Sequence, residues 1–416
     1  MLAALGTIGG IAIKVALVFG ILLTMVAYLV WLERKVLGHI QSRRGPLHVG
    51  PHGLLQPLAD ITKLFLKEDV IPDGADRVIF SLAPGIAVAS AMSAIAVVPF
   101  GQVITVFGHP IALHIADVDI GILYILAVGS LGVYGLILGG WASNNKFSLL
   151  GGLRSSAQMV SYELSLGLAL IGPLMLAGTL RMHGIVEAQR HLWFICLQPL
   201  GFLIYLVSAL AETNRIPFDL PEAESELVAG YHVEYSSMKF ALFMMGEYIA
   251  IIVASAVIVS LFFGGWQVPF LTTQDLIAGA PGYFRLAGYG FAGVSVLAGI
   301  FLISRFRPKK YRDARKFEVL VLGVPAVLAG LAIGGFMTLY DPSAFPAWGG
   351  PVFAAAAQFG VFLGKVFFSC FFFIWVRWTL PRFRYDQLMS FGWKGMLPLS
   401  LANLAVTGLL LLRGTH

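Results

Sequence analysis

The chain has 416 residues, of which 58% are hydrophobic and only 12% are charged, and its formal net charge is +6. Soluble domains carry about 25% charged residues, so this composition excludes a water-soluble fold. The two cysteines lie far apart in apolar segments, which argues against an iron–sulfur cluster or structural zinc held by this chain alone.

Ten apolar segments are long enough to cross a membrane, which takes about 20 residues each. They predict an all-α fold, a polytopic membrane helix bundle. The first segment is not expected to be a cleaved signal peptide, because its basic residues Arg34 and Lys35 follow the apolar run. The ten predicted spans are residues 11–32, 79–100, 118–140, 156–178, 192–211, 238–263, 285–304, 318–339, 352–377 and 396–412.

Basic residues indicate how these spans are oriented. Lys and Arg gather in the loops that follow spans 1, 7 and 9, and are absent from residues 101–117, 264–284 and 340–351. Loops rich in Lys and Arg stay on the cytoplasmic side. The loops after odd-numbered spans are therefore predicted to be cytoplasmic and both termini periplasmic, so the positive charge reflects topology and not nucleic-acid binding.

The first of these loops contains an amphipathic pattern. Leu54, Leu58, Ile61 and Phe65 are spaced at i, i+4, i+7 and i+11, which gives a helix one apolar face. The spacing predicts an amphipathic helix at the cytoplasmic boundary, although simple anchoring to anionic lipid would explain the same pattern. The run that ends span 1, residues 33–35, is expected to be an interfacial anchor.

Acidic residues occur inside the membrane segments. Glu163 in span 4 and Glu247 in span 6 each lie about two helical turns past the cytoplasmic start of their span, about 10–12 Å deep. Glu212 closes span 5 on the same side. The three carboxylates are therefore predicted to converge on one region in the cytoplasmic half of the bundle. The alternative is that each acid is neutral and hydrogen-bonded, for example to Tyr162 or Tyr248.

The loop after span 5 is a long acidic connection that runs from Glu212 to Glu234. It contains three alternating carboxylates, Glu222, Glu224 and Glu226. Like charges held close together raise one another's pKa and titrate as a coupled set. The pattern predicts a device that takes up and releases protons near neutral pH.

Composition also suggests three parts of the chain. Residues 1–266 form the first part of the membrane core, with spans 1–6. Residues 267–350 are predicted to be an inserted segment with two extra spans, because the addition of two spans leaves the orientation of the remaining chain unchanged. Residues 351–416 complete the core with the last two spans.

Five motifs carry a resemblance to a known family. They are Leu32–Pro46 (LERKVLGHIQSRRGP), Leu55–Lys63 (LQPLADITK), the acidic loop from Glu212 (ETNRIPFD) to Glu226, Gly230–Tyr235 (GYHVEY) and Pro381–Lys394 (PRFRYDQLMSFGWK). Together they resemble the H subunit, the quinone-chamber membrane subunit, of bacterial respiratory complex I, the proton-pumping NADH:quinone oxidoreductase. The likeness covers nearly all of residues 1–266 and 351–416, and the segment 267–350 departs from that family's usual eight spans.

The resemblance implies an eight-helix core in the bacterial inner membrane that anchors a peripheral electron-transfer arm and lines the quinone chamber. It implies a proton path of carboxylates that couples quinone reduction to pumping, with ubiquinone or menaquinone as substrate. No cofactor is expected in this chain, because the FMN and the iron–sulfur clusters belong to partner subunits. The expected proton-path residues are Glu163, Glu212, Glu222, Glu224, Glu226 and Glu247, and the expected quinone-binding residues are Arg34, Asp60, Lys63, Arg215 and Phe218.

Two other functions share parts of this pattern. The equivalent subunit of a membrane-bound hydrogenase would reduce protons instead of quinone. A stand-alone ion-coupled transporter, a different class, would use intramembrane acids to bind its coupling ions. The complete Glu-x-Glu-x-Glu loop favours the quinone-reducing subunit over the first, and the absence of an obvious inverted repeat argues against the second.

Overall fold

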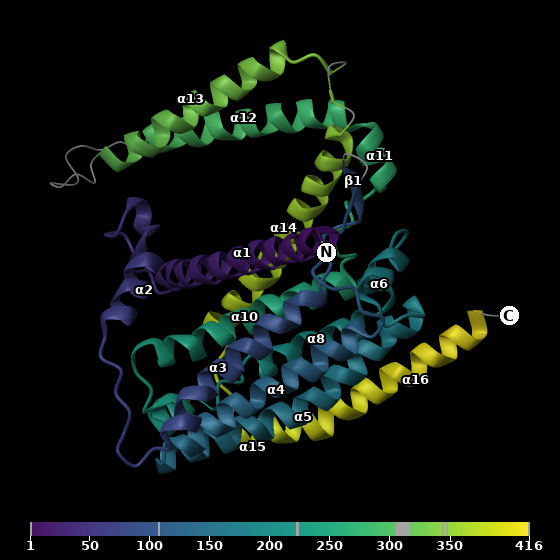
Figure 1. The fold of residues 1–416 in the computed structure, drawn as a ribbon. Coiled ribbons are helices and arrows are strands. Elements are labelled where there is room, and N and C mark those ends of the chain that lie inside the picture. Colours follow the sequence, from purple (N-terminus) through teal and green to yellow (C-terminus); the bar gives the residue numbers. More distant parts are fainter. Residues whose placement is uncertain are drawn as a thin grey trace.

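The computed structural model describes residues 2–106, 109–221, 224–304, 317–342, 345–346 and 348–414. In these ranges the chain is a bundle of long helices with one small antiparallel pair of strands (Figure 1). The strands are β1 (Ile104–Val106) and β2 (His109–Ile111), with Ile104 opposite Ile111. The predicted all-α membrane bundle is confirmed.

The helices fall into long membrane-length elements and short connecting ones. They are α1 (Leu2–Ile40), α2 (Gln56–Leu66), α3 (Arg77–Ala94), α4 (Gly121–Ala142), α5 (Lys146–Ala177), α6 (Met182–Ala188), α7 (Phe194–Leu197), α8 (Pro199–Glu212), α9 (Glu224–Leu227), α10 (Ser237–Phe262), α11 (Thr273–Ala278), α12 (Ala280–Ser304), α13 (Glu318–Leu339), α14 (Gly349–Thr379), α15 (Tyr385–Ser390) and α16 (Leu397–Gly414), with a π-helical segment at Phe391–Met396 between the last two.

Nine helices within the described ranges are long and apolar enough to cross a membrane. The predicted fifth span, 192–211, differs because the chain breaks at Gln198 into α7 and α8. Proline disfavours the helical conformation in the residue before it, and Pro199 starts α8. With 14 residues, α8 is about 21 Å long, short of the roughly 30 Å hydrocarbon core.

The bundle has α10 at its centre. In its most apolar stretch 78% of the residues are buried, against 11% in the equally hydrophobic α13. It packs against α3, α14, α8 and α1, so it has protein on several sides. The segment that follows α10 is tied to α14, where Lys365 Nζ donates to the carbonyl oxygens of Phe263, Gly265 and Gln267 at 2.8, 3.0 and 2.9 Å. These three bonds use all the donors of the ammonium group.

The helices α12 and α13 pack mainly on each other and meet the rest of the chain through α11 and α14 (Figure 1). Their contact is close at Gly299 and Gly323, because a Cβ atom at Gly299 would lie 2.7 Å from the Gly323 carbonyl oxygen. Small residues let helices approach in this way in membranes. The pair covers most of the segment expected to be inserted, but the division of the chain into three parts remains a prediction.

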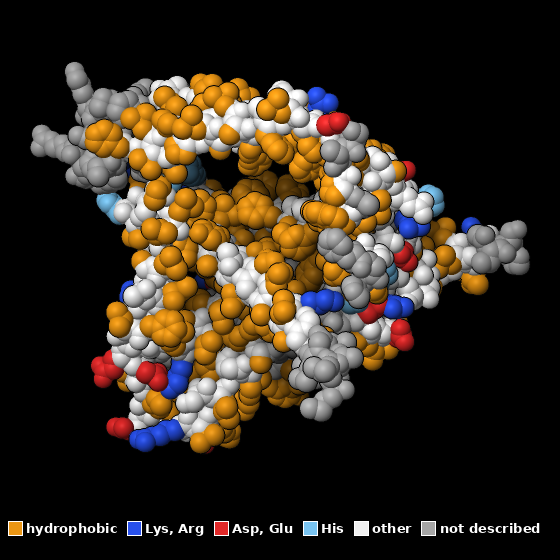
Figure 2. Space-filling view, turned by 45° about the horizontal axis from the view of Figure 1, so that its top comes forward, with side chains coloured by type: hydrophobic (Ala, Val, Ile, Leu, Met, Phe, Trp, Pro, Cys, Tyr) orange, Lys and Arg blue, Asp and Glu red, His pale blue; other side chains and the backbone are white. Residues whose placement is uncertain are grey.

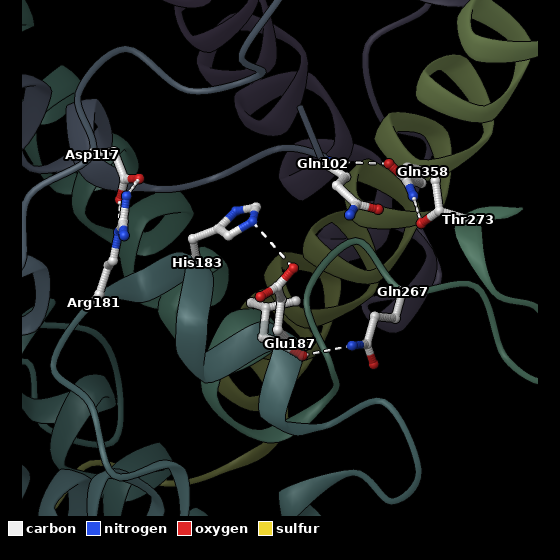
Figure 3. A network of polar contacts seen from close by, with 9 residues as sticks. Gln102, Asp117, Arg181, His183, Glu187, Gln267, Thr273 and Gln358 are labelled. Atoms are coloured by element: carbon white, nitrogen blue, oxygen red, sulfur yellow. Dashed lines mark hydrogen bonds and ion pairs between the residues drawn. The ribbon is translucent and has the colours of Figure 1, made fainter. Parts of the chain in front are cut away.

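The two ends of the bundle differ. The acidic-loop end, residues 41–76 and 213–236, carries α2 and the acidic connection. The hairpin end, residues 98–120, 178–198 and 263–280, carries the strands, α6 and α11. Figure 3 shows the polar contacts that join segments at the hairpin end, including the ion pair of Arg181 with Asp117. The Arg181 guanidinium lowers the pKa of Asp117 by donating hydrogen bonds to its carboxylate.

Candidate functional site

A cavity of about 120 Å³ lies among α3, α4, α5, α8 and α10. Its lining is mostly apolar and includes the three acids of the membrane segments, Glu163, Glu212 and Glu247. The structure therefore brings together the three residues that were predicted to converge. Carboxylates inside a membrane bundle are costly to bury, so a shared cavity is a candidate functional site.

Glu163 and Glu212 lie at one wall of this cavity, where α4 faces α5 and α8. Ser130 Oγ is within hydrogen-bonding distance of both Glu163 Oε1 and the Leu126 carbonyl oxygen. A Cβ atom placed on Gly129 would lie 3.3 Å from Glu212 Oε1. The absence of a side chain at Gly129 therefore leaves room for the Glu212 carboxylate beside Glu163.

Glu247 also lines the cavity, from α10, and is held by two groups from the acidic connection. Tyr231 donates from its hydroxyl to Glu247 Oε1 at 2.9 Å. Arg215 Nη2 lies 3.2 Å from Glu247 Oε2, and both side chains are nearly inaccessible to solvent. A buried ion pair with an added hydrogen bond is an arrangement that can hold a carboxylate ionised inside a protein.

The contacts continue from Arg215 to α1 and α14. The Arg215 guanidinium lies 4.5 Å from the centre of the Tyr248 ring. Tyr248 in turn donates to Glu33 Oε2 at 2.6 Å, and Glu33 forms an ion pair with Arg377. Glu33 is 5% exposed, so it is not the interfacial anchor that its position at the end of span 1 suggested.

The tyrosines beside the acids are not their partners. Tyr162 donates to the Leu388 carbonyl oxygen at 3.0 Å, while the neighbouring Glu163 contacts Ser130. Tyr248 likewise donates to Glu33, and Glu247 accepts a hydrogen bond from Tyr231 instead. Consecutive residues on a helix point in different directions, so adjacent side chains do not face each other. This geometry explains why the suggested tyrosine partners are wrong.

Only part of the predicted acidic triplet can be placed. Glu226 lies in α9 and accepts a hydrogen bond from Arg154 Nη1 at 2.7 Å, with its side chain 50% exposed. Glu224 begins α9, but its side chain lies outside the described part of the chain, as does the whole of Glu222. The coupling of the three carboxylates remains a prediction.

The five residues expected at the quinone chamber form two groups. Arg34 pairs with Asp60 at 2.5 Å near the surface, and Lys63 is exposed on the same helix, α2. Arg215 and Phe218 are instead buried, in the acidic connection. The Phe218 ring packs between Tyr162 and Phe383, with centroid distances of 5.4 and 5.6 Å.

The predicted amphipathic helix forms as α2, and its apolar side chains do not pack into the bundle. Leu58 and Phe65 are 61% and 66% exposed. An apolar helical face left open beside membrane spans is typical of a helix at the membrane boundary. Lys239 on α10 lies 2.9 Å from Asp69, just beyond this helix.

Sequence reasoning missed Asp219, which lies in the acidic connection between Phe218 and the buried Leu220. Arg382 Nη2 donates to Asp219 Oδ2 at 2.8 Å, which joins this connection to the segment before α15. Burial raises the pKa of Asp219 to about 6, although the Arg382 charge acts in the opposite direction. Gln158 fixes the same connection by donating to the carbonyl oxygens of Ala211 and Phe218, each at 2.8 Å.

No group of three or more His, Cys, Asp and Glu side chains that could hold a metal ion occurs in the described part of the chain. The site is instead a set of carboxylates and arginines in a membrane bundle. This defines a class: a multi-pass membrane protein with an internal acid-lined cavity that is linked to its acidic-loop end.

Comparison with known proteins identifies the family. The NADH dehydrogenase family matches residues 13–408, and the chain therefore belongs to it. It is 46% identical to the NADH-quinone oxidoreductase H subunit 1 of Solibacter usitatus, with 96% of each chain covered. It is 43% identical to the H subunit 1 of Geobacter metallireducens, with 96% and 95% covered, and 44% identical to NADH-quinone oxidoreductase subunit 8 of Rhodothermus marinus, with 94% of each covered. The resemblance to the H subunit inferred from the motifs is confirmed, and the chain is a membrane subunit of this oxidoreductase type.

Proposed function

We propose that this chain lines the quinone chamber of a proton-translocating NADH:quinone oxidoreductase and couples quinone reduction to proton pumping through its buried carboxylates. The quinone is its substrate. The NADH site, the FMN and the iron–sulfur clusters lie in partner subunits, which the chain anchors to the inner membrane. The names of its relatives and the acid-lined cavity support this function together.

The observation that carries the proposal is the shared cavity of Glu163, Glu212 and Glu247. The ion pair of Glu247 with Arg215 connects that cavity to the acidic connection. A change of charge near Arg215 alters the electrostatic potential at Glu247 directly, because the two groups are in contact and shielded from solvent. Reduction of a quinone near this arginine would therefore change how readily the carboxylates bind protons.

The pair of Arg34 with Asp60 and the open apolar face of α2 support a role at the entrance for quinone. A quinone has a long apolar tail and a polar headgroup, so it needs an apolar route that ends at polar groups. On this proposal the tail passes α2, and the headgroup is reduced near the acidic-loop end. That end is cytoplasmic by the distribution of Lys and Arg, which leaves both termini periplasmic.

The test is the substitution Glu247→Gln in the assembled complex. It keeps the size of the side chain and removes the charge that faces Arg215. We expect normal assembly, with proton pumping and quinone reduction reduced at least tenfold. The matched control is Glu187→Gln, an exposed acid at the hairpin end, which should retain both activities. Wild-type pumping and quinone reduction in Glu247→Gln would refute the coupling role.

Purification in mild detergent separates this function from that of a transporter. A coupling subunit should be isolated together with subunits that contain flavin and iron–sulfur clusters. Isolation of the chain alone or as a homo-oligomer would favour the transporter. A complex that reduces protons and has no quinone-dependent activity would favour the hydrogenase alternative.

A further inference from the structure

A second cavity, of about 250 Å³, lies at the hairpin end of the bundle, between α1, α10 and α14. We call it the α1–α14 groove. Side chains such as Leu17, Leu22 and Phe362 make its lining almost wholly apolar. Water is a poor occupant of such a space, because it would lose hydrogen bonds without gaining polar partners.

The groove has the depth of one membrane leaflet. Its lining on α1 runs from Ile13 to Met25, which is about 18 Å at 1.5 Å per residue. The hydrocarbon core of a bilayer is about 30 Å thick, so the groove extends slightly past its midplane. A membrane-spanning helix of a partner would need a seat along the whole thickness, whereas an acyl chain occupies one leaflet.

Basic groups lie at one end of the groove. Lys14 and His114 both line it, and Lys14 lies close enough to His114 to act on it electrostatically. The Nδ1 atom of His114 is buried and has no hydrogen-bond partner within the described part of the chain. Of the other charged groups that act on His114, Asp117 is paired with Arg181. The Lys14 ammonium supplies the positive charge, and the His114 ring, whose pKa is lowered by burial, can donate a hydrogen bond from Nδ1 to an anionic oxygen.

We propose that the α1–α14 groove binds an anionic phospholipid, with an acyl chain along α1 and its phosphate at Lys14 and His114. The apolar lining fits the chain, the depth fits one leaflet, and the basic end fits the headgroup. Figure 2 shows that hydrophobic side chains also line the hollow beneath the α12–α13 pair, so this side of the protein is open to lipid. The lipid would fill space between α1 and α14 that no described side chain occupies.

Two substitutions in the purified complex test the two ends of this site. Leu17→Trp places a larger side chain in the groove at a position that is 58% exposed, so the fold should tolerate it. Its control is Leu297→Trp, on the lipid-facing surface of α12. Lys14→Gln removes the charge, and its control is Arg190→Gln, an exposed position at the same end.

The measurement is native mass spectrometry of the delipidated complex after incubation with phosphatidylglycerol or phosphatidylcholine in mixed micelles. We expect the wild-type complex and both controls to retain one more phosphatidylglycerol molecule than Leu17→Trp. Lys14→Gln should reduce the preference for phosphatidylglycerol about fivefold, the effect of one basic group near a membrane surface. Equal lipid retention in Leu17→Trp and its control would overturn the proposal, as would a density map of the complex with a partner's helix in the groove.

Discussion

The buried ion pair of Glu33 with Arg377 gives the most direct test of how this site is held together. The side chains of Glu33 and Arg377 are 7% and 19% exposed, and the only other donor to Glu33 in the described contacts is the Tyr248 hydroxyl at 2.6 Å. The substitution Arg377→Met leaves a buried carboxylate without its positive partner. Removing one member of a buried pair costs about 3–5 kcal/mol, so we expect a loss of stability of that size.

A double-mutant cycle separates this loss of stability from the interaction energy between Glu33 and Arg377. The free energy of unfolding of the chain is measured in mixed micelles by titration with a denaturing detergent, for Arg377→Met, Glu33→Gln and the double variant. Because neither charge remains in the double variant, it should recover most of the stability that Arg377→Met loses. The coupling energy should therefore be about 3 kcal/mol or more, because it contains most of the loss in Arg377→Met in addition to the loss in Glu33→Gln.

The matched control is the surface pair of Arg154 with Glu226, whose side chains are 30% and 50% exposed. Exposed pairs contribute about 0–1 kcal/mol, so Arg154→Met should have a small effect. A loss in Arg377→Met that is no larger than the loss in Arg154→Met would refute the reasoning from burial.

Three further predictions concern the cavity and the acidic connection. Burial raises the pKa of Asp219 to about 6 from an ordinary value near 3.8, so its contribution to stability is complete below about pH 4 and is lost as the pH rises through 6. Asp219→Asn should abolish this decline when unfolding midpoints are measured over a series of pH values. The same decline in the variant as in the wild type would contradict the prediction. Gly129→Val should displace the Glu212 carboxylate, whose oxygen lies 3.3 Å from the position of a Cβ atom on Gly129, and should therefore lower the number of protons pumped per quinone reduced. Gly167→Val is the control, because a Cβ atom there meets open space. Equal pumping ratios in the two variants would exclude the effect. Tyr231→Phe removes the 2.9 Å hydrogen bond to Glu247 and should lower the free energy of unfolding by about 1.5–3 kcal/mol. Tyr134→Phe, at an exposed position, should lower it little. A similar loss in both variants would disprove the role of this hydrogen bond.

The convergence of Glu163, Glu212 and Glu247 could be predicted because depth in a membrane follows from sequence. Each residue of a helix advances about 1.5 Å, so the distance of an acid from the start of its span fixes its level in the bilayer. The side of the bilayer follows from the loop charges. The depth of each acid and its side of the bilayer together were enough to place the three carboxylates in one region. In the structure all three line the same cavity.

The partners of these acids could not be predicted in the same way. Glu33 meets Arg377 across 344 positions of the chain, and no local pattern reveals such a contact. The position of Glu33 next to Arg34 and Lys35 suggested a solvated anchor, but tertiary packing turned its side chain inward. Tyr231 reaches Glu247 through a loop whose path is fixed by contacts of Gln158 with distant carbonyl groups.

The break of the fifth span had a visible cause that hydropathy overlooks. A count of apolar residues treats residues 192–211 as one continuous span, because the proline does not interrupt the hydrophobicity of the segment. The backbone requirement of Pro199 acts on Gln198 instead, and the side chain of that glutamine is satisfied by Thr407 and Asn403 on α16. Proline alone does not decide such a break, because Pro84, Pro173 and Pro325 lie inside continuous helices.

The enclosure of α10 determines how the chain tolerates genetic variation. A helix surrounded by other helices offers almost no position where a side chain can change volume without a clash or a void. A saturation mutagenesis library should therefore lose most substitutions throughout α10, while α13, with its apolar surface open to lipid, accepts exchanges among hydrophobic residues. Two segments that no hydropathy plot distinguishes would then evolve at very different rates.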